Sequence, residues 1–356
     1  MRLERLILKN FRSYKQATHH FGEVTLLIAP NGSGKTNLLE AIYLLATGIS
    51  DRAGKIEEMI SWDGELGSVS GIVEDKSERS DLSVVLTRGV YMGKRTPKRR
   101  YLVDGVGRAR ATFVGHLPAT LFRPEDMRLL EGSPSRRRGY LDLAIGMAHP
   151  EYLRALSVYE ATLKRRNRLL DQIRDGISKR VELAYWDQSL IKNGEILTNY
   201  RRGYIEYLND HIKVPFGEYC IEYKSSAISP SRLLQYADAE VAVGYTLVGP
   251  HKDDFILISN HKFSNSQIDN NIDLMTYGSR GEQRLGVLFL KIGGMEYLEE
   301  KRGVKSLLLL DDIFSELDQE HRIEVVRLME GRQVILTSAE DETTAYFGDT
   351  ASIIRL

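Results

Sequence analysis

The chain has 356 residues, of which 42% are apolar and 28% charged, a composition typical of a globular protein long enough for two domains. Its 49 basic and 49 acidic residues cancel, so any surface for nucleic acid or membrane must be local. Cys220 is the only cysteine, which excludes an intrachain disulfide and a cysteine-based zinc site. Residues 1–5 lack the apolar core of a secretory signal, and no apolar run approaches the roughly 18–20 residues that span a bilayer. We therefore expect a cytoplasmic protein.

The first part of the chain has the pattern of a βα unit followed by a small antiparallel meander. Residues 3–9 and 24–28 are short apolar strands, and a helical pattern begins at Thr36 and stops at Gly48. Further strands are predicted at 69–74, 82–88 and 101–103. The stretch between residues 10 and 22 is a connection in this interpretation.

The middle of the chain is predicted to be helical. Apolar residues recur at helical spacing from about residue 134 to 211, with breaks at Asp175-Gly176 and Asn193-Gly194. No heptad repeat persists long enough for a long coiled coil. Later elements are predicted as strands 218–223 and 255–259, helix 280–300, strand 306–310, helix 319–330, strand 333–337 and a strand near 352–354. This pattern predicts a nucleotide-binding domain in two halves, 1–115 and 246–356, with a mainly helical arm, 116–245, inserted between them.

Residues 29–36, Ala-Pro-Asn-Gly-Ser-Gly-Lys-Thr, match a phosphate-binding loop except that Ala29 replaces its first glycine. Gly32 and Gly34 allow backbone N–H groups to surround phosphates, and the helix that follows directs its positive end at them. Lys35 would reach the β- and γ-phosphates of ATP, and Thr36 would hold Mg²⁺. The alternative, a glycine-rich turn that binds nothing, is disfavoured because an apolar strand precedes the loop and a helix follows it.

Asp311 and Asp312 follow four consecutive leucines, the pattern of a buried parallel strand. A carboxylate at the end of such a strand can hold Mg²⁺, which assigns Asp311 to the metal, and Asp312 is the candidate that polarises the attacking water. Most ABC-type ATPases have a glutamate at the second position. The shorter aspartate predicts slow turnover, and the alternative is that both acids are ordinary turn residues.

Ser279 is placed to cap a helix that begins at Arg280, with Glu282 in its first turn. A capped helix alone would explain Ser279-Arg280-Gly281-Glu282-Gln283. This segment, however, lies shortly before an apolar strand that ends in Asp-Asp. In that position its serine hydroxyl and helix N–H groups are suited to bind the γ-phosphate of an ATP held by a second subunit. The sequence therefore predicts an ATP-dependent homodimer.

These motifs together resemble the RecF family, which is related to the SMC and ABC ATPases, and the resemblance runs the length of the chain. Its motifs are residues 10–14, 30–37, 122–126, 132–138, 249–254, 277–284 and 311–318. It implies an α/β fold, an ABC/SMC-type P-loop ATPase head of mixed sheet and helices, with an inserted mainly helical arm. Ser315, Glu316, Leu317 and Asp318 would form the turn after the metal-binding strand.

The resemblance also implies the site residues. The catalytic residues would be Lys35, Asp311 and Asp312, with Thr36 and Asp311 holding Mg²⁺. ATP would be bound by Pro30, Asn31, Gly32, Ser33, Gly34, Lys35, Thr36, Asn37 and Arg12, and by Ser279, Arg280, Gly281 and Gln283. Glu125 or a neighbour is a candidate for the Q-loop residue. Two departures concern hydrolysis: Ala29, and Thr337-Ser338-Ala339, which lacks the histidine with which many ABC ATPases sense the γ-phosphate.

Two basic clusters are candidates for binding the DNA backbone, with an ordinary solvated surface as the alternative. One contains Lys94, Arg95, Lys98, Arg99 and Arg100, and the other Lys164, Arg165 and Arg166. The resemblance implies double-stranded and gapped DNA as partner, with RecR and RecO assisting and RecA acting downstream, in recombinational repair, replication-fork recovery and the SOS response.

Two other functions remain open at this point. An ATPase subunit of a membrane transporter would share the site chemistry but would have no use for the arm or the basic clusters. A non-hydrolysing ATP-dependent DNA clamp would explain Ala29, Asp312 and the missing histidine. DNA-stimulated hydrolysis distinguishes the first alternative from the leading hypothesis, and single-turnover phosphate release excludes the second.

Overall fold

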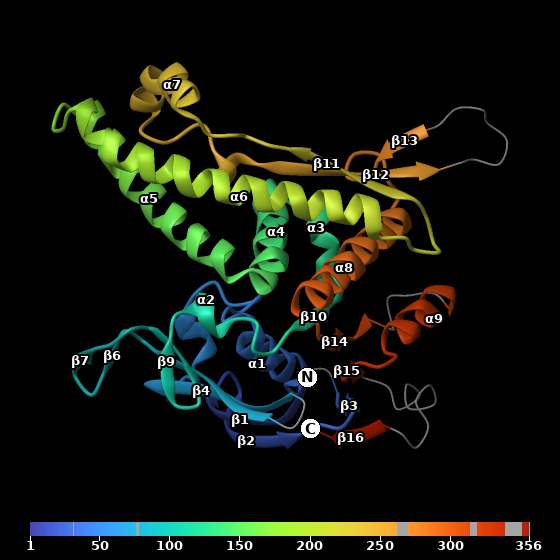
Figure 1. Cartoon of the computed structure of the whole chain (residues 1–356). Helices are drawn as coiled ribbons and strands as arrows, with labels where there is room; N and C mark the ends of the chain where they lie inside the picture. Colours follow the sequence, from blue (N-terminus) through green and yellow to red (C-terminus); the bar gives the residue numbers. More distant parts are fainter. Residues whose placement is uncertain (31, 76–77, 262–269, 314–318, 339–350, 356) are drawn as a thin grey trace. The chain divides into compact units, whose positions relative to one another are not determined.

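The computed structural model describes residues 1–30, 32–75, 78–261, 270–313, 319–338 and 351–355 (Figure 1). The chain divides into two compact units, residues 1–126 with 298–356 and residues 127–297. The second unit includes residues 246–297 as well as most of the predicted arm, because β12 (Asp254–His261) pairs with β11 (Tyr219–Lys224) in one small sheet.

A parallel sheet joins the two ends of the chain in the first unit, in the order β10-β14-β15-β3-β16 (Figure 1). Its strands are β3 (Val24–Ile28), β10 (Ala119–Phe122), β14 (Leu307–Asp311), β15 (Val334–Ser338) and β16 (Ala351–Arg355). Every residue of β14 and β15 is buried, as expected of parallel strands covered on both faces. All but β10 are predicted by the sequence; β10 is too short to have a clear periodicity.

Helix α1 (Lys35–Thr47) follows β3 and ends as predicted at Gly48. The backbone of Gly48 has φ 71°, a left-handed conformation that glycine adopts without steric cost, and its N–H donates to the carbonyl of Leu44 at 2.8 Å. Two short helices, α2 (Arg110–Phe113) and α9 (Gln319–Leu328), also belong to this unit.

An antiparallel sheet forms the other layer of the first unit, in the order β2-β1-β4-β5-β8-β9. Its strands are β1 (Arg2–Phe11), β2 (Tyr14–His20), β4 (Leu66–Asp75), β5 (Glu78–Thr87), β8 (Arg99–Val103) and β9 (Val106–Arg108). The predicted meander is therefore present. The prediction that residues 10–22 form a connection is wrong, because β2 returns along the edge of β1; its polar sequence carries no strand signal. A separate two-stranded ribbon, β6 (Val90–Tyr91) and β7 (Lys94–Arg95), projects from this unit (Figure 1).

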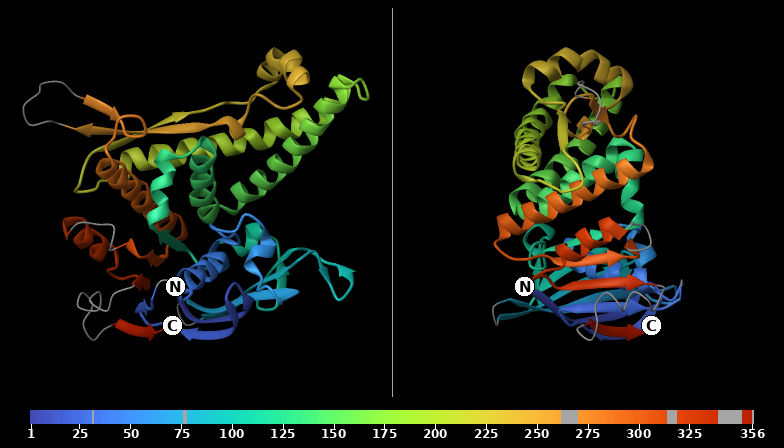
Figure 2. Two further views of the ribbon diagram at one scale, coloured as in Figure 1. Left: turned by 180° about the vertical axis from the view of Figure 1, so that it is seen from behind. Right: turned by 90° about the vertical axis from the view of Figure 1, so that its right-hand side faces the viewer.

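The second unit is built on long helices, as the periodicity of residues 134–211 predicts. Helices α5 (Pro150–Arg174) and α6 (Ala184–His211) lie side by side in all views (Figures 1 and 2). Its other α-helices are α3 (Arg128–Glu131), α4 (Pro134–Ala148), α7 (Pro230–Val243) and α8 (Arg280–Arg302), whose residues 298–302 are grouped with the first unit, and β13 (Asn270–Asp273) is the third strand of its small sheet. None of the described helices is long and apolar enough to cross a membrane.

The predicted break at Asn193-Gly194 is wrong, whereas the break at Asp175-Gly176 is confirmed. Helix α6 continues through Gly194 because the missing side chain allows close packing. A Cβ at this position would lie 2.7 Å from Cγ2 of Ile228 and 3.2 Å from a ring carbon of Tyr159. Glycine here serves helix packing rather than helix termination.

A buried polar network in the second unit accounts for the motif at residues 249–254. The carboxylate of Asp253, which is fully buried, accepts hydrogen bonds from Arg201 at 2.8 Å, from the backbone N–H of Ser226 at 2.6 Å and from the hydroxyl of Tyr223. Arg201 also pairs with Asp142 at 2.7 Å. Loss of one partner from such a buried pair would cost about 3–5 kcal/mol, so this motif has a structural role in the unit.

His251 lies in the same motif and is held as a neutral imidazole. Its Nε2 donates to the carbonyl of Thr246 at 3.1 Å, so Nδ1 is the acceptor of the 2.8 Å hydrogen bond from Tyr159. Burial lowers the pKa of His251 from 6.5 to about 4, and the positive charges of Lys252 and Arg138 also lower it.

We expect acid to destabilise the second unit through His251. Between pH 6.5 and about 4, the unfolded chain binds a proton at His251 that the folded protein does not, so the stability present above pH 6.5 is lost as the pH falls. The loss attributable to this residue is at most about 3 kcal/mol. Urea unfolding across this range should show a weaker pH dependence for His251→Gln than for the wild type. The exposed His211→Gln is the control, and equal slopes for wild type and His251→Gln would refute the expectation.

Candidate nucleotide site

The predicted phosphate loop connects the end of β3 to the start of α1. Gly32 and Gly34 have φ angles of 86° and 108°, in the left-handed region that glycine enters freely. Ala29 is buried and has no positive φ, so its methyl group is compatible with the loop. Asn31 lies outside the described residues. The described part of the loop thus has the backbone conformation from which N–H groups can surround an anion.

The ammonium group of Lys35 lies over this loop. Its Nζ donates to the carbonyl oxygen of Ala29 and, at 3.3 Å, to that of Pro30, and the side chain is only 8% exposed. These contacts hold the charge against the backbone of the loop. An ammonium with three donors can exchange carbonyl oxygens for phosphate oxygens without leaving the loop.

Thr36 and Asp311 meet although 274 residues separate them in the sequence. Thr36 Oγ1 lies 3.5 Å from Asp311 Oδ1. Mg²⁺ binds oxygen at about 2.0–2.1 Å, so one ion can contact both atoms, and a hydroxyl with a carboxylate is a donor set that suits it. The two residues fit the metal site predicted for them.

Asp311 lies in an environment that disfavours its charged form. Burial raises the pKa of Asp311, and the negative charge of Glu125 raises it further. Hydrogen bonds from Thr337 and Thr36 act in the opposite direction, as does the positive charge of Arg52. A divalent cation at this place would favour the carboxylate, which links binding of the metal to deprotonation.

Thr337 positions both acids at the end of β14, although the sequence drew attention to this segment only for its missing histidine. The Thr337 hydroxyl donates to Asp311 Oδ1 at 2.8 Å and accepts from the backbone N–H of Asp312 at 3.0 Å. Asp312 has a positive φ of 49°, a conformation that aspartate tolerates better than most residues. The adjacent Ala339 and the predicted turn at Ser315–Asp318 lie outside the described residues.

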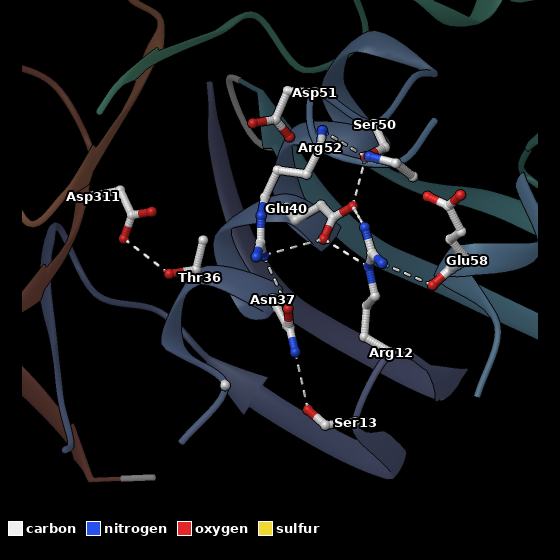
Figure 3. Close-up of polar contacts among 12 residues, drawn as sticks. Arg12, Ser13, Thr36, Asn37, Glu40, Ser50, Asp51, Arg52, Glu58 and Asp311 are labelled. Atoms are coloured by element: carbon white, nitrogen blue, oxygen red, sulfur yellow. Dashed lines mark hydrogen bonds and ion pairs between the residues drawn. The ribbon is translucent and has the colours of Figure 1, made fainter. Parts of the chain in front are cut away.

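Glu40 on α1 was not predicted and is the buried centre of an ionic cluster beside the loop (Figure 3). Arg12 donates to both of its carboxylate oxygens, at 2.6 and 2.9 Å, and Arg52 lies 3.6 Å from one of them. Arg52 also donates to Asn37 at 3.0 Å. One carboxylate therefore contacts two guanidinium groups beside the start of the helix.

In the second unit, Ser279 and Glu282 form the predicted helix cap. The N–H of Glu282 donates to Ser279 Oγ at 3.3 Å, and the N–H of Ser279 donates to the Glu282 carboxylate at 2.7 Å. Ser279, Arg280 and Gly281 are exposed at this N-terminus. Gln283 is buried, and its amide donates to the carbonyl of Leu274 at 2.8 Å, so it supports the turn before the helix.

The structure divides the basic cluster of the first unit. Lys94, Arg95 and Arg100 are exposed. Lys98 is exposed as well but pairs with Glu57. Arg99 is turned toward the end of α1, where Nη1 donates to the carbonyl of Gly48 at 2.5 Å. Arg99 therefore serves the packing of the sheet on the helix.

The predicted cluster on α5 is also smaller than expected. Lys164 and Arg165 are exposed, and the Arg165 guanidinium lies 5.4 Å from the ring centre of Trp186. Arg166 is 2% exposed and forms ion pairs with Asp187 at 2.6 Å and Glu240 at 2.7 Å. A buried guanidinium between two carboxylates cannot bind a DNA phosphate, so including Arg166 in this surface is corrected.

We expect Thr337→Val to destabilise the first unit by about 1–3 kcal/mol, because it keeps the shape of the side chain but removes a hydroxyl that the buried Asp311 and the partly buried N–H of Asp312 use. Thr337→Ser retains the hydroxyl and should stay within about 1 kcal/mol of the wild type. Urea unfolding at neutral pH measures both. A valine variant as stable as the serine variant would show that the hydroxyl does not hold this strand end.

Comparison with known proteins places the chain among relatives of nearly equal length. The family model described as the RecF/RecN/SMC N terminal domain matches residues 2–355. The DNA replication and repair protein RecF of Enterococcus faecalis is 32% identical over 365 aligned residues, covering 95% of this chain and 92% of the relative. The RecF of Geobacillus kaustophilus is 33% identical and covers 92% and 90%.

The fold is similar to a solved structure as well. The structure described as the recombination mediator protein RecF-ATPrS in the RecFOR pathway superimposes with a TM-score of 0.85 at 28% identity, covering 100% of this chain and 96% of that chain. The predicted fold, an α/β ATPase head with mainly helical additions, is thereby confirmed. On its sequence over nearly its whole length and on its fold, the chain belongs to the RecF family.

Proposed function

We propose that this protein is an ATP-dependent DNA-binding protein of DNA replication and recombinational repair, acting as RecF does in the RecFOR pathway. The observation that carries the proposal is the contact between Thr36 and Asp311, which places the phosphate loop next to the acidic end of a buried strand. Its relatives are named DNA replication and repair proteins, and a similar structure is described as a RecF-ATP complex.

In this proposal residues 30–37 bind the phosphates of ATP and Lys35 neutralises them. Thr36 and Asp311 would hold Mg²⁺, which would supply positive charge to the phosphates. Arg12 contributes through Glu40, which fixes its guanidinium beside α1. Asp312 orients the attacking water, and its short side chain makes turnover slow.

The second half of each site comes from another copy of the chain. Ser279, Arg280 and Gly281 present a hydroxyl, a cation and backbone N–H groups at the start of the long helix α8, where the helix dipole favours an anion. Gln283 holds the preceding turn. ATP bound to one subunit would thus be capped by the partner subunit, so dimerisation would depend on whether ATP is bound.

DNA binds, in this proposal, to exposed cations that contact the backbone without reading bases. These cations are Lys94, Arg95 and Arg100 in the first unit and Lys164 and Arg165 in the second. The homodimer closes on duplex DNA near a single-strand gap, and RecO and RecR would join it to load RecA.

We expect the wild-type protein to change from monomer to dimer only with ATP·Mg²⁺, and to retain a gapped duplex in that state. Light scattering measures the solution mass with and without nucleotide and DNA. A monomer under all conditions, with ATP binding demonstrated separately, would exclude the proposed clamp.

Ser279→Arg should separate ATP binding from dimerisation. Its bulk and charge would obstruct the surface that caps the partner's ATP, while the affinity of the monomer for ATP should change by less than about threefold, or about 0.6 kcal/mol. Lys35→Ala is the matched comparison, because it should lose ATP binding itself. Equilibrium binding of a fluorescent ATP analogue and light scattering measure the two steps. Normal dimerisation of Ser279→Arg would contradict capping by the partner.

A further inference from the structure

Trp62 is 98% exposed, although tryptophan side chains are mostly buried in folded proteins. It lies in a tight turn, residues 61–64, closed by a 2.9 Å hydrogen bond from the N–H of Gly64 to the carbonyl of Ser61. The turn follows the short helix of residues 56–59 in the first unit. An indole ring held in solvent exposes a large flat apolar surface.

The turn that carries Trp62 is held in place by Arg88. The Arg88 guanidinium donates to the carbonyl of Gly64 at 3.1 Å and to those of Ser61 and Trp62 at 3.4 Å each. Three carbonyl groups of the turn thus share one cation. The backbone beneath the indole is therefore fixed, and the exposure of the ring is not the result of a loosely attached loop.

Arg88, which holds the Trp62 turn, begins a basic segment of the chain, whereas the residues that flank Trp62 include the exposed acids Asp63 and Glu65. Residues 88–100 contain six cations and no acid, but Lys98 pairs with Glu57 and Arg99 is turned toward α1, which leaves Arg88, Lys94, Arg95 and Arg100. The β6–β7 ribbon, which follows Arg88, carries exposed Lys94 and Arg95 (Figure 1). Aromatic rings that stack on bases, together with cations that follow the backbone, are the two components of single-strand binding surfaces.

The Trp62 turn is also connected to the phosphate loop. Ser61 binds the segment of residues 10–12 twice: its N–H donates to the carbonyl of Asn10 at 2.9 Å and its hydroxyl to that of Arg12 at 2.8 Å. The same segment continues to Tyr14, whose hydroxyl donates to the carbonyl of Gly34 at 3.2 Å. A ligand on Trp62 would thus act on a turn that is hydrogen-bonded, through one short segment, to the ATP site.

We infer that Trp62 is a stacking platform for an unpaired base of DNA, and that it gives this protein its contact with the single-stranded side of a gap. The inference rests on the proposed function, since it requires that the protein bind DNA. A nucleobase can also come from ATP. A ring exposed to 98% offers no walls to enclose a mononucleotide, whereas a DNA strand can bring phosphates to Arg88 and to the basic segment that follows it.

Fluorescence tests the contact directly, because the chain has two tryptophans, Trp62 and Trp186. In Trp186→Phe the emission comes from Trp62 alone. Single-stranded oligo(dT) should quench it, whereas a blunt duplex and ATP·Mg²⁺ should not. Quenching by ATP·Mg²⁺ but not by DNA would assign Trp62 to adenine and overturn the inference.

Binding measured by fluorescence anisotropy of labelled DNA gives the energetic test. Trp62→Ala should weaken binding of single-stranded DNA about 5- to 100-fold, the range for loss of one stacked base, and Trp62→Phe should retain most of the affinity. Affinity for blunt duplex should be unchanged by Trp62→Ala, whereas Lys94→Ala should weaken both. Leu234→Ala, another substitution at a side chain that is 78% exposed, is the control.

The outcomes separate this inference from the proposed function. DNA binding by the wild type with no quenching of Trp62, and equal loss of single-strand and duplex affinity in Trp62→Ala, would overturn the inference alone. Failure of the wild type to bind any of these DNAs would overturn the proposed function together with it.

Discussion

The nucleotide site depends on the pairing of β3, β14 and β15 as adjacent parallel strands. Parallel strands end at the same edge of a sheet, so the phosphate loop after β3, Asp311 at the end of β14 and Thr337 near the end of β15 are brought together there. Both faces of β14 and β15 are buried, so these strands form the core of the sheet that carries the site. The geometry of Thr36 and Asp311 is thus a consequence of how the apolar strands pack.

The charged side chains near this edge of the sheet are paired with one another. Glu40 is buried and is shared by Arg12 and Arg52, so each guanidinium is oriented by a group that cannot move into solvent (Figure 3). Arg12 also donates to the carbonyl of Glu58 at 2.8 Å, close to the turn that carries Trp62. The nucleotide site and the exposed indole are consequently connected by hydrogen bonds within the first unit.

The second unit shows how charged sequence motifs can be structural. Arg166 lies in a run of cations that resembles a phosphate-binding surface, but on α5 it faces inward to Asp187 and Glu240. Asp253 belongs to the motif at residues 249–254, which is one of those that resemble the RecF family. It is buried and forms an ion pair with Arg201. Such pairs add little stability relative to apolar packing, yet losing one partner is costly, so they favour one arrangement of the helices that they connect.

The sequence by itself determined the phosphate loop, the acidic strand end, the capped helix at Ser279 and most of the helices and strands, because each depends on local periodicity or on fixed spacing. It did not reveal β2, whose alternation is polar, or the continuity of α6 through Gly194, which depends on a neighbouring side chain. Among the site residues, Glu40 and Thr337 were not predicted, because a lone glutamate in a helix or threonine in a strand carries no signal in sequence. Only the tertiary structure decided which cations are exposed, as Lys94 is, and which are buried, as Arg166 is, because neighbours in sequence on a helix or strand point to different sides and burial depends on what packs against each side.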